Sequence, residues 1–140
     1  MIILDTNVIS ELMRPRPAPD VVAWIAAQAG TELLTTSISE AEIFYGIELL
    51  ARGKRREQLL KAAEAIFTED LSGRVLGFDS DAARAFARIG AQRRALGRPI
   101  SQADAQIAAI ALVRRAKLAT RDVTDFLDCG VEVVDPWDGS

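Results

Sequence analysis

Short apolar runs rich in β-branched residues alternate with longer amphipathic stretches along the chain. This alternation favours parallel βαβ units over a sandwich or an all-α protein. The runs that we interpret as strands are residues 2–4, 33–35, 75–78, 118–120 and 132–134. Between them, apolar residues recur at helical spacing, as at Ile43, Ile47 and Leu50 or over residues 107–115. We therefore expect an α/β fold with helices on both faces of a parallel sheet.

Prolines and glycines divide the helical stretches. Pro15, Pro17 and Pro19 separate a short first helix from a second one around residues 21–28. Gly97 and Pro99 lie between two later helices in the same way. The chain has 140 residues, of which 49% are hydrophobic, and no internal repeat or flexible linker interrupts it. We expect a single domain over residues 1–140.

Hydropathy and charge limit the cellular location and the partners that we expect for this chain. No apolar stretch approaches the roughly 20 residues of a membrane helix, and the first residues do not resemble a signal peptide. We therefore expect a cytoplasmic protein with no membrane partner. The net charge of −3 gives no overall basic character of the kind that nucleic-acid-binding proteins show. Basic clusters over residues 52–56, 93–98 and 114–117 are typical of solvated helix faces.

The rarest residue types exclude several chemistries. The sequence contains no histidine, which supplies the general base of most hydrolytic triads and is the commonest zinc and iron ligand. The single cysteine, Cys129, excludes an internal disulfide and a zinc cluster built from cysteines alone. Carboxylates remain for hydrolytic chemistry, and oxygen-only ligands suit hard cations such as Mg²⁺ and Mn²⁺.

Asp5 follows the first apolar run and precedes a helix that begins near Thr6 and Asn7. This order puts a carboxylate at the carboxyl edge of the sheet, where ligands bind in open α/β folds. A helix cap explains Asp5 equally well.

Two acids near residue 40 have competing interpretations. Ser37 with Glu40, and Ser39 with Glu42, form overlapping capping boxes at the start of a helix. Two positions along a helix differ by about 200°, so only one of the two glutamates can enter a common site. Gly46, one turn after Glu42, would let a ligand or another backbone approach.

Asp104 and Asp122 occupy comparable positions later in the chain. Asp104 lies three residues after Ser101, a possible cap, and shares a helical face with apolar residues, so we expect its carboxylate to be directed inward. Asp122 follows the fourth strand, where it could also cap a short helix. Asp125 and Asp128 are nearby acids further from the strand end. Four acids meeting at one edge would repel one another unless they took up protons or bound a cation.

Four motifs, in this order and spacing, together carry a resemblance that covers essentially the whole chain. They are Ile2-Ile3-Leu4-Asp5-Thr6-Asn7, Ser39-Glu40-Ala41-Glu42-Ile43-Phe44-Tyr45-Gly46, Asp104-Ala105-Gln106-Ile107-Ala108, and Ala119-Thr120-Arg121-Asp122 followed by Asp125-Phe126. The sequence resembles PIN domains, specifically the VapC-type ribonuclease toxins of toxin–antitoxin pairs. Residues 131–137 also resemble the last strand and tail of this family, and we interpret Pro136 and Trp137 as structural.

The resemblance implies a site and a set of partners. The family's acidic site falls on Asp5, Glu42, Asp104 and Asp122, and many members have asparagine in place of the last. The polar residues that it adds are Asn7 and Thr120 as support and Arg121 as a weaker substrate contact. It also implies a three-layer α/β/α fold with sheet order 3-2-1-4-5, Mg²⁺ or Mn²⁺ as cofactor, and a homodimer. Its partners would be an RNA substrate, a cognate antitoxin and, only through that antitoxin, DNA.

The expected reaction is hydrolysis of RNA by an activated water, leaving a 5′-phosphate and a 3′-hydroxyl. One alternative is a phosphotransferase with Asp5 as nucleophile, although the second aspartate expected in that class is replaced by Asn7. Another alternative is an inactive PIN-like binding module that acts with its antitoxin. The identity of the RNA and the number of metal ions do not follow from the sequence.

Overall fold

A five-stranded parallel sheet forms the centre of the computed structural model, which describes residues 1–138. The strands are β1 Ile2–Leu4, β2 Leu33–Thr36, β3 Val75–Leu76, β4 Lys117–Ala119 and β5 Val133–Val134. They lie in the order β3-β2-β1-β4-β5, and each neighbouring pair is parallel. The expected α/β class and strand order are confirmed. The expected domain over residues 1–140 includes residues 139 and 140, which lie outside the described part of the chain.

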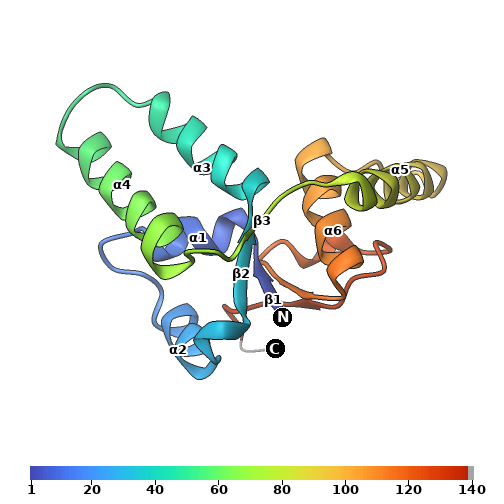
Figure 1. Cartoon of the computed structure of the whole chain (residues 1–140), viewed down its shortest axis with the longest axis horizontal. Coiled ribbons are helices and arrows are strands. Elements are labelled where there is room, and N and C mark those ends of the chain that lie inside the picture. Colours follow the sequence, from blue (N-terminus) through green and yellow to red (C-terminus); the bar gives the residue numbers. More distant parts are fainter. Residues whose placement is uncertain (139–140) are drawn as a thin grey trace.

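Helices cover the sheet on two sides (Figure 1). They are α1 Thr6–Leu12, α2 Pro19–Ala27, α3 Ser37–Glu48, α4 Lys54–Glu64, α5 Ser80–Ala95 and α6 Gln102–Arg114. Shorter helical segments are η1 Gly30–Glu32, η2 Ala65–Asp70 and η3 Val123–Phe126. Among residues 1–138, none of the helices has the length and apolar character needed to span a bilayer.

Two apolar cores lie on opposite faces of the sheet. Side chains alternate along a strand, so Ile3 points into one core and Ile2 and Leu4 into the other. The Ile3 core is completed mainly by α5 and α6, whereas α1 to α4 supply most of the second core. Because both faces of the sheet are buried at β1, all three residues of this strand are apolar.

Several element boundaries differ from the sequence predictions. The strands expected at 75–78 and 132–134 are shorter, and the one expected at 118–120 begins and ends one residue earlier. The second helix begins at Pro19, because proline fits the first helical position, where its missing N–H is not needed. Leu50 lies beyond the end of α3, and Arg115 beyond that of α6, where its left-handed conformation stops the helix.

Candidate active site

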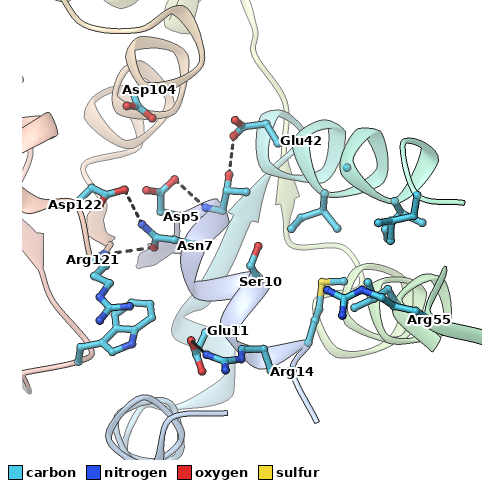
Figure 2. A pocket seen from close by; sticks show the side chains of 18 residues that line it. Asp5, Asn7, Ser10, Glu11, Arg14, Glu42, Arg55, Asp104, Arg121 and Asp122 are labelled. Carbon is cyan, nitrogen blue, oxygen red and sulfur yellow. Dashed lines mark hydrogen bonds and ion pairs between the residues drawn. The ribbon is translucent and has the colours of Figure 1, made fainter. Parts of the chain in front are cut away.

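A pocket of about 730 Å³ opens at the carboxyl ends of β1 and β4 (Figure 2). Its lining includes all four acids that the sequence singles out, namely Asp5, Glu42, Asp104 and Asp122. Asp5 follows β1, Asp122 lies beyond β4, and the other two acids come from α3 and α6. The parallel topology therefore brings residues more than 100 positions apart in the sequence to one edge of the sheet.

Asp5 is the most buried of these acids, with 4% of its surface exposed. Its Oδ1 accepts a hydrogen bond from the backbone N–H of Thr6 at 2.8 Å, and its Oδ2 accepts one from Thr120 Oγ1 at 2.7 Å. Asp5 is also the N-terminal cap of α1, so both interpretations of this residue apply. Burial raises the pKa of the Asp5 carboxyl to about 6, against the lowering effect of these two hydrogen bonds, and Asp104 and Glu42 raise it further.

Thr120 connects Asp5 to the rest of the acidic edge. Its hydroxyl, which is fully buried, accepts hydrogen bonds from Asn7 Nδ2 and the backbone N–H of Asp122, both at 3.1 Å. These bonds use the hydroxyl's two acceptor positions, so its single hydrogen is directed at Asp5. Asn7 Nδ2 also donates to Asp122 Oδ2 at 3.1 Å, and Asn7 Oδ1 accepts from the backbone N–H of Arg121. The two residues expected to support the site, Asn7 and Thr120, thus join β1 to the loop after β4.

Glu42 is the glutamate of α3 that lines the pocket, whereas Glu40 does not. Thr6 Oγ1 lies 2.7 Å from Glu42 Oε1 and 2.9 Å from Ser39 Oγ. Because the carboxylate can only accept, the Thr6 hydroxyl donates to Glu42. Thr6 therefore orients Glu42, a role that its place in the Asp5-Thr6-Asn7 motif could have suggested.

The expected capping boxes at the start of α3 are wrong. Thr36, the last residue of β2, caps the helix by accepting a hydrogen bond from the backbone N–H of Ser39 at 3.1 Å. The helix begins one residue earlier than a Ser37 cap requires, so neither predicted box can form. Glu42 is consequently released from any capping role. At Gly46, on the same helix, the space that a side chain would fill is open and belongs to the pocket.

Asp104 lies in the first turn of α6, whose cap is Ser101 as expected. Its carboxylate is half-buried and faces the pocket, so the expectation that it points into the apolar interior is wrong. The residues that enter the core from this helix start at Ala105. Burial raises the pKa of the Asp104 carboxyl, opposed by a hydrogen bond with Ser101, and the charges of Asp125, Glu42 and Asp122 add to the rise.

The four acids fit a hard cation in their chemistry. They offer only oxygen ligands, and their mutual effects on the pKa values of Asp5 and Asp104 show that they lie within electrostatic reach of one another. In the described part of the chain, however, no three His, Cys, Asp or Glu side chains are close enough to form a ready-made metal site. An ion that retains several of its waters, as Mg²⁺ does, suits such a spacing.

The remaining candidates divide between the pocket and its surroundings. Asp122 does not cap η3 through its side chain, so its capping alternative is not realised. Arg121 lines the pocket, whereas Asp125 and Asp128 do not. The structure adds pocket residues that the sequence analysis did not assign to the site, and they include Ser10, Glu11, Arg14, Arg55 and Trp137.

Residues 2–128 match the family model of the PIN domain, and this chain belongs to that family. Two relatives extend the similarity over nearly the whole chain. The VapC ribonuclease Y4jK of Sinorhizobium fredii is 41% identical, with 99% of each chain aligned. The toxin FitB of Neisseria gonorrhoeae is 38% identical over 98% of this chain and 99% of its own length.

The fold agrees with that of a solved relative. A chain in the structure of FitAB bound to the IR36 DNA fragment matches this protein with a TM-score of 0.90 and 38% sequence identity. The match covers 98% of this chain and 96% of the other.

Proposed function

We propose that this protein is a metal-dependent endoribonuclease toxin that hydrolyses RNA phosphodiester bonds in the acidic pocket. The observation that carries the proposal is the Asp5 carboxylate, which is buried, oriented by two hydrogen bonds and surrounded by further acids. A buried carboxylate with other carboxylates close by is costly unless a proton or a cation compensates it. The VapC ribonuclease relative supports the nuclease activity, and the FitB toxin relative supports the role as a toxin.

The four acids have two roles in the proposal. Asp5 and Asp104 would hold Mg²⁺ or Mn²⁺ directly, and Glu42 and Asp122 would complete the shell or bind its waters. A bound ion would supply a lowered pKa for the attacking water and positive charge for the scissile phosphate. Thr120 and Thr6 keep Asp5 and Glu42 in fixed orientations through their hydroxyl groups. Cleavage leaves a 5′-phosphate and a 3′-hydroxyl.

The partners follow from the family. FitAB, the complex that contains the matched chain, has been solved bound to DNA. We propose that this protein likewise works with an antitoxin that inhibits it, that it forms a homodimer, and that it meets DNA only through the antitoxin. We place its activity in the cytoplasm.

The test uses a total RNA pool and mapped cut ends. Wild-type protein should cleave RNA with Mg²⁺ or Mn²⁺, and a chelator should abolish cleavage until metal is restored. The variants Asp5→Asn and Asp104→Asn should lose about a hundredfold or more of the activity, which corresponds to several kcal/mol of metal-assisted stabilisation. Asp81→Asn, an exposed acid at the start of α5, is the matched control and should remain fully active.

Metal binding gives a second readout that does not depend on turnover. Saturating Mn²⁺ should raise the melting temperature of the wild type and of Asp81→Asn, but not that of Asp5→Asn, because only a binding site in the folded state produces the shift. Full cleavage by Asp5→Asn would refute the assignment. Purified protein that binds its partner but cleaves no RNA with either metal would favour the inactive binding module.

A further inference from the structure

One cation of the pocket, Arg121, is held on an aromatic ring. Its guanidinium carbon lies 5.0 Å from the centroid of the Trp137 ring, and both side chains line the pocket that contains Asp5. In Figure 2, Arg121 lies next to Asp122, on the other side of Asp5 from Glu42. This guanidinium forms no ion pair with Asp5, Glu42, Asp104 or Asp122, although Asp122 is its neighbour in the sequence.

The backbone at both residues is fixed by hydrogen bonds. The N–H of Arg121 donates to Asn7 Oδ1 at 3.3 Å, which ties the loop after β4 to the start of α1. The N–H of Trp137 donates to Asp135 Oδ1 at 2.8 Å, and the indole is partly buried against the core formed with α1 to α4. The Trp137 ring is therefore held in place by a segment of the chain other than the one that carries Arg121.

The position of the cation matters because of what lies next to it. A guanidinium directed at the acids would neutralise the charge that a metal ion needs. Cation–π attraction instead holds it over the indole, which leaves the N–H donors at its edge free to bind another group. Those donors match the geometry of a phosphate, with which arginine forms paired hydrogen bonds.

We propose that Trp137 is a positioning residue that holds Arg121 at the rim of the pocket, where its guanidinium binds an RNA phosphate next to the scissile one. This inference rests on the proposed ribonuclease function. It gives Trp137 a part in substrate binding in addition to the structural one expected from the sequence, and it gives Arg121 a defined ligand.

The test measures cleavage kinetics on an oligonucleotide that spans a site cut by the wild type in the RNA pool. Arg121→Ala should raise KM about tenfold with little change in kcat, because it removes a charge-assisted contact made in both ground and transition states. The slope of log KM against log salt concentration should also fall by about one, the contribution of a single phosphate contact. Arg88→Ala removes an exposed arginine of α5 outside the pocket and should leave KM and the slope unchanged.

The Trp137 variants separate positioning from simple stability. Trp137→Ala should raise KM about threefold and lower the salt slope even though it removes no charge, whereas Trp137→Phe retains a ring and should stay near wild type. In an Arg121→Ala background, Trp137→Ala should have no further effect on KM. An undiminished effect there would overturn the inference, as would wild-type KM and slope in both single variants of an active enzyme. A wild type that cuts no RNA would instead refute the proposed function itself.

Discussion

Two of the charged side chains that the described part of the chain buries, Arg93 and Asp5, are satisfied in opposite ways. Arg93 of α5 is 5% exposed and lies against the Ile3 core, while Asp5 is 4% exposed at the edge of the pocket. The Arg93 guanidinium donates to the carbonyl oxygens of Arg98, Asp125 and Leu127 at 2.7–3.0 Å and contacts Cys129 Sγ. Asp5 has two donors but also faces other acids.

This contrast separates a structural charge from a functional one. Arg93 Nε and Nη1 donate to three carbonyl oxygens, so the guanidinium joins the end of α5 to η3 and the residue that follows it. Asp5 is surrounded by a mixture of donors and like charges, so the folded protein becomes more favourable when a proton or a cation joins it. A buried charge with repulsive neighbours is thus a stronger sign of a binding site than burial alone.

Removal of the structural charge should have the largest effect on stability. Arg93→Met fills similar space but leaves three carbonyl oxygens without their donor, and it should lower the free energy of unfolding by about 3–5 kcal/mol. Urea denaturation measures the change. Arg88→Met, on the exposed side of the same helix, is the control and should change stability little. If Arg93→Met proved as stable as wild type, the distinction between the two charges would fail.

The pH dependence of stability tests the other half of the comparison. Asp5 binds its proton more tightly when folded than when unfolded, so the free energy of unfolding should fall as pH rises from the ordinary value of 3.8 to about 6. Relative to Asp5→Asn in chelator, this loss should reach about 3 kcal/mol above pH 6. Parallel urea titrations of the two proteins from acidic to neutral pH measure it. A constant difference between them would show that burial of Asp5 has no electrostatic cost.

Substitutions of Thr120 test whether its hydroxyl is needed to hold Asp5 in place. Thr120→Val keeps the shape but leaves Asn7 Nδ2, the Asp122 N–H and Asp5 Oδ2 each short of a partner, and it should cost about 2 kcal/mol of stability as well as activity. Thr120→Ser retains the hydroxyl and should lose about 1 kcal/mol for the missing methyl, with cleavage preserved. Equal loss of cleavage in both variants would contradict a role for the hydroxyl.

The smallest effect is expected at Asp122. Asp122→Asn can still accept from Asn7 through its remaining oxygen, and the residue is exposed, so stability should change by less than about 1 kcal/mol. Its cleavage should fall less than that of Asp104→Asn, because an amide oxygen can still bind a metal-held water. Inactivity as complete as that of Asp5→Asn would make Asp122 a direct ligand.

The sequence predicts the positions of the strands well because apolar runs, turns and acids agree there, and β1 has its expected bounds. The strand order was expected only from the resemblance to the family, and the structure has that order. It predicts local capping poorly at α3, where Ser37 and Ser39 compete with Thr36 and only the buried end of β2 decides between them. Serine and threonine at neighbouring positions offer equivalent caps until tertiary packing selects one.

The sequence also fails where a residue's partner comes from a distant segment. Arg93 belongs to a basic cluster that looks like a solvated helix face, yet two of its acceptors, Asp125 of η3 and Leu127, lie more than 30 residues away in the sequence. Likewise, nothing near Trp137 in the sequence indicates that Arg121 stacks on it. Local periodicity carries no information about such contacts, whereas it does place Asp5 and Asp122 at strand ends.

The bond between Thr120 and Asp5 joins positions 115 residues apart, across the adjacent strands β1 and β4. During synthesis, β4 and Thr120 are translated more than a hundred residues after Asp5. A nascent chain that stops before residue 117 therefore has neither the neighbouring strand nor the hydroxyl that orients Asp5. The order of the elements along the gene thus delays assembly of the acidic centre until β4 and Thr120 have been made, so that chains that stop earlier lack it.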